Sequence, residues 1–84
     1  MPSTEDLQAI SEKGQKVYEK IRFQYEPSEN GKYLAIEPET EEVFLGNTGV
    51  EATELAKKKY PDKIFYLIKI GFESVESIAS LYRN

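Results

Sequence analysis

One segment, from Lys32 to Gly71, constrains the fold more than any other part of the chain, because turn residues divide it into short apolar runs. Short runs with alternating or continuous apolar character are typical of β-strands. The last run is apolar at both odd and even positions, which is typical of a strand covered on both faces of its sheet. We therefore expect strands over residues 32–37, 43–45 and 63–70.

A helix over residues 49–59, between the second and third predicted strands, has clear start and stop signals. Thr48 and Glu51 have the spacing of a capping box, in which each side chain accepts a hydrogen bond from an otherwise free amide at the helix start. Basic residues gather near the other end, where they complement the helix dipole. Pro61 then ends the helix, since the residue before a proline avoids helical geometry.

Apolar residues at spacings of three and four predict a further helix over residues 4–25, which ends before Pro27. Gly14 lies within this apolar stripe, and either a close approach to a strand or a kink would explain it. The stripe also has a heptad character, so packing on the sheet and a dimer seam are both open. Its members are Leu7, Ile10, Gly14, Val17, Ile21 and Tyr25.

The segment from Ser74 to Tyr82 also has apolar residues at helical spacing, and we expect a short C-terminal helix there. Its three serines weaken this pattern, so an extended segment is the alternative. The chain order α-β-β-α-β predicts one α+β domain over residues 1–84 with a three-stranded, mainly antiparallel sheet and helices packed on it. In the simplest arrangement the first strand lies between the other two and is antiparallel to both.

The composition excludes several kinds of functional site. The chain has no cysteine and no histidine, so thiolate metal ligands, cysteine nucleophiles and the usual general base at neutral pH are missing. No apolar run approaches the roughly 18 residues of a membrane span, and the first residues are polar and acidic. We therefore expect a cytoplasmic protein that is not an enzyme and has no cofactor or membrane segment.

A cluster of carboxylates, Glu37, Glu39, Glu41 and Glu42, lies at the turn between the first two predicted strands. A catalytic pair needs two carboxylates that face each other across a cleft, with one pKa raised by burial. We expect these residues on one exposed turn, where water keeps them ionised. They also lack the alternating ligands and central glycine of an EF-hand loop, so weak contact with a divalent cation is only the alternative to a solvated turn.

What remains is surface for a binding partner. The chain has six tyrosines, a residue type that is enriched in interface hot spots but also fills small cores. We expect a protein partner or self-association, through the N-terminal helix together with Tyr33, Tyr66, Phe72 and Tyr82.

Nucleic-acid binding is the alternative function. Its candidate residues are Lys57, Lys58 and Lys59, together with aromatic residues of the sheet. The net charge of −4 opposes this reading, because an acidic domain repels phosphate backbones.

Four short stretches, Gly31–Glu37, Phe44–Thr48, Lys59–Pro61 and Phe65–Gly71, resemble small uncharacterised prokaryotic proteins that are common in cyanobacteria and archaea. The resemblance covers residues 31–71, about half of the chain. Some of those proteins look like partner proteins encoded beside toxin genes. The resemblance therefore implies a ββαβ core and a partner-binding role, and it supplies no catalytic residues.

Overall fold

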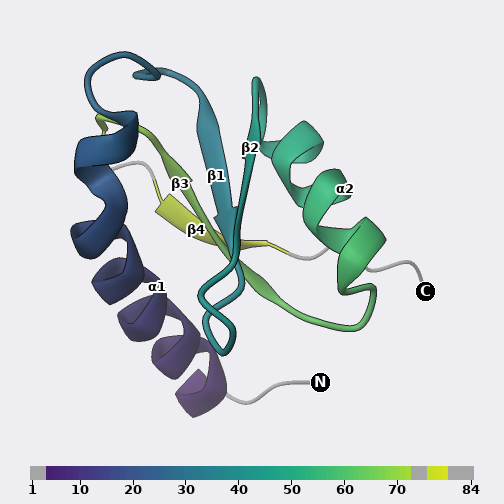
Figure 1. Cartoon of the computed structure of the whole chain (residues 1–84). Coiled ribbons are helices and arrows are strands. Elements are labelled where there is room, and N and C mark those ends of the chain that lie inside the picture. Colours follow the sequence, from purple (N-terminus) through teal and green to yellow (C-terminus); the bar gives the residue numbers. More distant parts are fainter. Residues whose placement is uncertain (1–3, 73–75, 80–84) are drawn as a thin grey trace.

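Two helices cover opposite faces of an antiparallel sheet (Figure 1). The computed structural model describes residues 4–72 and 76–79. The sheet has the strand order β2-β1-β3-β4, and every neighbouring pair of strands is antiparallel. The elements in chain order are α1 (Thr4–Tyr25), β1 (Tyr33–Ile36), β2 (Val43–Gly46), α2 (Gly49–Lys59), β3 (Phe65–Lys69) and β4 (Glu76–Ala79).

The predicted α+β class is confirmed. The helices predicted over residues 4–25 and 49–59 are present with those bounds. Strand β1 lies between β2 and β3 and is antiparallel to both.

The predicted C-terminal helix is wrong over residues 76–79, where the chain forms strand β4. This strand pairs with β3, with Phe65 opposite Ala79 and Ile68 opposite Glu76. An edge strand presents unpaired backbone groups that a following segment can satisfy. The serines of the C-terminal segment make a helix a weak competitor with that pairing. The extended alternative therefore holds, and the sheet has a fourth strand.

Side chains alternate between the two faces of the sheet, and this alternation divides the interior into two clusters. Leu34 and Ile68, which are opposite each other in the ladder, point towards α1, whereas Ala35 and Leu67 point towards α2. The prediction that the third strand is covered on both faces is confirmed, because α1 and α2 both contact β3.

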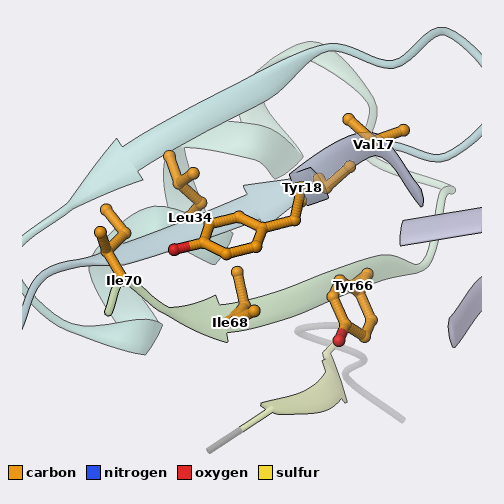
Figure 2. Close-up of a cluster of buried hydrophobic side chains, with 7 residues drawn as sticks. Val17, Tyr18, Leu34, Tyr66, Ile68 and Ile70 are labelled. Atoms are coloured by element: carbon orange, nitrogen blue, oxygen red, sulfur yellow. The ribbon is translucent and has the colours of Figure 1, made fainter. Parts of the chain in front are cut away.

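The cluster under α1 is built from large side chains, with the Tyr18 ring lying among Leu34, Ile68 and Ile70 (Figure 2). Gly14 marks the closest approach of α1 to the sheet, since a Cβ atom there would be 2.3 Å from Cγ of Tyr66. α1 runs unbroken from Thr4 to Tyr25, so close packing rather than a kink accounts for this glycine. The apolar stripe of α1 packs in the chain's own core, through Ile10, Val17, Ile21 and Tyr25.

The cluster under α2 is built mainly from small side chains, namely Ala35, Ala52 and Ala56, together with Phe65. Around it lies a rim of partly buried aromatic and aliphatic residues: Tyr33, Phe44, Tyr60 and Leu67. The rings of Phe44 and Tyr60 meet edge to face, with centroids 6.3 Å apart.

The predicted cap of α2 is confirmed in its main feature. The Thr48 hydroxyl accepts a hydrogen bond from the amide of Glu51 at 3.1 Å. The carboxylate of Glu51 in turn accepts one from the amide of Asn47 at 2.7 Å, one residue earlier than in a standard capping box. The two bonds fix the first turn of α2.

Candidate interaction surface

The four predicted contact residues do not form one surface. Tyr66 is only 1% exposed and lies in the cluster under α1, so its side chain is not available to a partner in this structure. The rings of Tyr33 and Phe72 both lie close to the ammonium group of Lys69, whose strand position points to the other face of the sheet. Tyr82 lies outside the described residues.

Lys69 contacts two of the predicted residues, Tyr33 and Phe72. It is opposite Tyr33 in the β1–β3 ladder, so both side chains emerge on the α2 face. Its Nζ atom lies 6.0 Å from the ring centroid of Tyr33 and 4.8 Å from that of Phe72. Both distances fall within the range of cation–π contacts. The ammonium group therefore lies within cation–π distance of two aromatic rings.

A tight turn fixes the position of Phe72. Gly71 has a φ of +82°, a conformation that glycine adopts at little cost. The amide of Phe72 then donates a hydrogen bond to the carbonyl of Lys69 at 3.0 Å. The ring of Phe72 is thereby directed back over Lys69, while 47% of the residue is still exposed.

The first turn of α2 adds apolar area beside this cluster. A Cβ atom on Gly49 would lie 2.9 Å from Cδ2 of Leu67 and 3.8 Å from Cδ2 of Tyr33, so the turn rests on those side chains. Val50 follows and is 60% exposed. Its side chain points about 180° around the helix from that of Lys59, which pairs with Glu42 just before β2. We call Tyr33, Val50, Leu67, Lys69 and Phe72 the Lys69 surface.

Sequence reasoning missed Lys69 and Val50 as members of this surface. Lys69 continues the alternation of Leu67, and it faces Tyr33 only in the register that β1 and β3 adopt. The spacing within the strand predicts that Lys69 and Leu67 share one face of the sheet. That Lys69 is opposite Tyr33 follows only from the pairing of β1 with β3.

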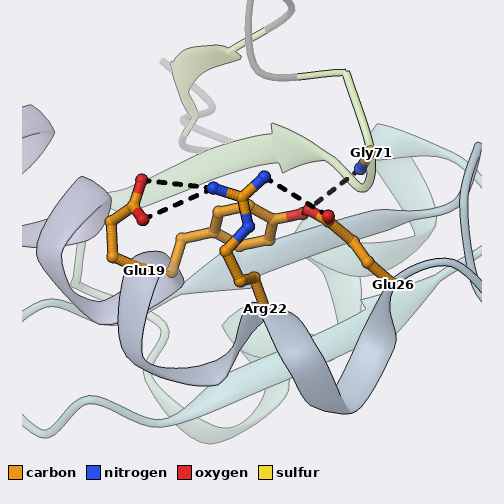
Figure 3. A network of polar contacts seen from close by, with 5 residues as sticks. Glu19, Arg22, Glu26 and Gly71 are labelled. Atoms are coloured by element: carbon orange, nitrogen blue, oxygen red, sulfur yellow. Dashed lines mark hydrogen bonds and ion pairs between the residues drawn. The ribbon is translucent and has the colours of Figure 1, made fainter.

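A polar network ties the end of α1 to the turn that carries Phe72 (Figure 3). The hydroxyl of Tyr18 donates a hydrogen bond to the carboxylate of Glu26 and accepts one from the amide of Gly71 at 3.2 Å. Arg22 adds an ion pair to Glu26 at 3.3 Å, and its guanidinium lies 5.6 Å from the centroid of the Tyr18 ring. Residues far apart in sequence thus hold the residue that precedes Phe72.

The network shifts both of its acidic groups. Burial, followed by the hydrogen bond to Glu26, raises the pKa of Tyr18 to about 12. The hydrogen bond from Tyr18, with help from Arg22, lowers the pKa of Glu26 below its ordinary value. At neutral pH the phenol therefore stays protonated and the carboxylate ionised, which is the combination that the hydrogen bond requires.

The three lysines of the alternative function do not present three free charges on one face. Successive side chains of a helix point about 100° apart. Lys59 forms an ion pair with Glu42 at 2.6 Å, and this bond raises the pKa of Lys59. Glu42 also accepts a hydrogen bond from the hydroxyl of Tyr60. Lys57 is half-buried and Lys58 is exposed.

The prediction that the acidic residues share one exposed turn is wrong for Glu37, which is only 1% exposed. Its carboxylate accepts a hydrogen bond from the amide of Thr40 at 2.7 Å, and its backbone carbonyl accepts one from the amide of Glu41 at 2.8 Å. The tight turn after β1 leaves the Thr40 amide without a partner in the ladder, and the Glu37 side chain folds inward to satisfy it.

The other carboxylates of the turn point to separate cations. Glu41 pairs with Lys20 of α1 at 2.7 Å, and Glu39 pairs with Lys63, which lowers the pKa of Glu39. Within the part of the chain that the structure describes, no three histidine, cysteine, aspartate or glutamate side chains are grouped so that they could hold a metal ion. The turn therefore serves to fasten α1 and the start of β3 to the sheet.

An open cleft of about 320 Å³ lies between α1 and this turn. Its lining combines apolar side chains such as Ile10 and Ile64 with the charged residues Lys13, Glu37 and Lys63. Two carboxylates at the cleft already have partners: Glu37 accepts a hydrogen bond from the Thr40 amide, and Glu39 pairs with Lys63. The cleft therefore offers no arrangement comparable to the Lys69 surface.

Comparison of the chain with protein-family models, with curated proteins and with solved structures gave no match. Among the described residues, no helix combines the length and the apolar character needed to cross a bilayer.

Proposed function

We propose that this chain is a non-enzymatic protein-interaction module that binds a protein partner through the Lys69 surface. One observation carries the proposal: the ammonium group of Lys69 lies within cation–π distance of two aromatic rings, and one of the two aromatic residues, Phe72, is 47% exposed. Interface hot spots commonly combine aromatic residues with a cationic group, surrounded by apolar contacts that exclude water.

The rigidity of the surface supports the same proposal. Tyr33 and Lys69 are held by the β1–β3 ladder, Val50 by the capped first turn of α2, and Phe72 by the Gly71 turn. A surface whose side chains are already positioned loses less conformational entropy when it binds. The partner is therefore expected to meet a preformed site.

Nucleic-acid binding has weaker support. Lys59 is neutralised by Glu42, and the neighbouring lysines point in different directions around α2. The net charge of −4 also repels a phosphate backbone.

The proposal can be tested by replacing Phe72 with the photo-crosslinking residue benzoylphenylalanine. Phe23 provides a matched control, because it is a phenylalanine that is 85% exposed and lies on α1, the helix that covers the other face of the sheet. We expect crosslinking at position 72, in nuclease-treated lysate of the source organism, to give one discrete protein adduct that position 23 does not give. Adducts of equal yield at both positions, or none at position 72, would contradict the proposal.

A further inference from the structure

We infer that the partner presents an acidic side chain next to an apolar one, with its carboxylate on Nζ of Lys69 and its apolar group against Phe72. This inference rests on the proposed function and specifies the chemistry of the partner. It is carried by the charge and the surroundings of Lys69.

Lys69 differs from four other lysines of the described residues. Four lysines elsewhere reach carboxylates at hydrogen-bond distance: Lys20, Lys32, Lys59 and Lys63. The recorded contacts of the Lys69 ammonium are instead two aromatic rings, and no carboxylate of residues 7–72 forms an ion pair with it. Within residues 7–72, this charge is therefore available to the carboxylate of a partner.

The setting of Lys69 makes it selective for a carboxylate that carries apolar neighbours. Lys69 is half-buried, and rings partly shield its ammonium from water. An ion pair in such a place is stronger than one between fully exposed side chains, because less solvent screens it. Phe72 lies against Lys69, is exposed and gains from apolar contact.

A polyphosphate fits this surface less well than an acidic peptide. A nucleic-acid backbone carries closely spaced charges and needs several cations along its path. Lys69 is a single cation, and the lysines with known contacts elsewhere are already paired with carboxylates. One carboxylate flanked by an aromatic or aliphatic side chain matches both the charge and the apolar area.

A phage-displayed library of random short peptides, selected on the immobilised full-length protein, tests this inference. We expect enrichment of peptides in which aspartate or glutamate adjoins an aromatic or aliphatic residue. In fluorescence anisotropy, Lys69→Met should weaken the binding of a selected peptide by about tenfold or more, the usual size of a lost hydrogen bond to a charged group. Lys69→Arg should largely retain binding, and added salt should weaken the wild type more than Lys69→Met.

Lys58→Met is the matched control, since Lys58 is an exposed lysine on α2 that lies outside the Lys69 surface. It should leave peptide affinity unchanged. Circular dichroism of each variant shows whether it retains its fold.

Other outcomes separate this inference from the proposed function. Enriched peptides without acidic residues, or acidic peptides that bind equally well to Lys69→Met, would overturn the inference. If such peptides still lost affinity in Phe72→Ala, the proposed function would stand. Failure to enrich any peptide would also overturn the inference, whereas the crosslink at position 72 decides the proposed function independently.

Discussion

The two faces of the sheet have cores of different kinds. The face under α1 is filled by large side chains, including Tyr18, Tyr66 and Leu34, which are almost fully buried. The face under α2 has three alanines and the fully buried Phe65 at its centre, and its other aromatic residues lie at the rim and are only partly buried. The same sheet therefore has one closed face and one face with an open margin.

This difference separates stability from the proposed binding role. Small residues allow α2 to approach the sheet closely, as the contact between Gly46 and the backbone of Ala52 shows. Three alanines and one phenylalanine bury less apolar area than the seven buried residues under α1, so the α1 face should supply most of the hydrophobic stabilisation. The rim residues Tyr33 and Leu67 extend past the alanines and contribute to the Lys69 surface.

The largest effect is expected for Tyr66→Ala. Removal of a buried aromatic side chain costs about 3–5 kcal/mol, a large share of the about 4–12 kcal/mol that a domain of this size has. Urea denaturation should show this loss in the free energy of unfolding. Phe72→Ala, on the open side, should cost less than about 1 kcal/mol, since Phe72 is 47% exposed. Equal losses for both variants would contradict the division between the faces.

The positions of Tyr66 and Tyr33 show where sequence reasoning reached its limit. The bounds of α1 and α2 could be predicted, because caps, prolines and helical spacing are local signals. The third strand is apolar at successive positions, so its pattern does not tell which of its residues faces which helix. Only the register, with Tyr33 opposite Lys69 and Ile36 opposite Tyr66, assigns them.

Two other features depended on contacts that the sequence pattern does not contain. β4 forms because β3 offers an edge, a tertiary condition that overrides the helical spacing of Ile78 and Ala79. Glu37 is buried because its carboxylate satisfies the Thr40 amide within the turn. Both follow from backbone hydrogen bonds that must be made somewhere, and their partners are known only once the turns are in place.

Gly14→Ala should have the next largest effect, again on the α1 face. A methyl group at this position would lie 2.3 Å from Cγ of Tyr66, so α1 or the ring must move. Such overpacking costs about 1–3 kcal/mol, which outweighs the gain of about 1 kcal/mol in helix propensity. Thermal and urea unfolding should both report the loss.

Lys16→Ala is the matched control, because Lys16 is an exposed residue of the same helix. It should leave the free energy of unfolding nearly unchanged. If Gly14→Ala stabilised the protein instead, α1 would not be in close contact with Tyr66.

Thr48→Ala tests the open side through the cap of α2. Loss of the hydrogen bond from the Glu51 amide should cost about 1 kcal/mol. Because this turn carries Val50, Thr48→Ala should also weaken the binding of a selected peptide. Gly14→Ala should weaken that binding only if it unfolds the chain. Thr48→Ser retains the hydroxyl and should restore both quantities. If Thr48→Ala bound the peptide with unchanged affinity, Val50 would not be part of the surface that binds it.

The smallest effects are expected from the Tyr18–Glu26 network, and they depend on pH. The pKa of Glu26 is lowered in the folded state, so its contribution is present above the ordinary value of 4.5 and is lost as the pH falls through the lowered pKa. The pKa of Tyr18 is raised from 10.0 to about 12, so its contribution is present below pH 10.0 and is lost as the pH rises towards 12. Urea denaturation of Glu26→Gln in acid and of Tyr18→Phe in alkali should show a weaker pH dependence than the wild type.

The network also tests whether the two faces act independently, because Tyr18 belongs to the α1 core and its hydroxyl holds Gly71, next to Phe72. Tyr18→Phe keeps the ring and removes that hydrogen bond. If the turn is held mainly by the bond from the Phe72 amide to Lys69, the variant should lose some stability and bind a selected peptide with unchanged affinity at neutral pH. Reduced affinity in a folded variant would mean instead that the closed face positions the Phe72 ring.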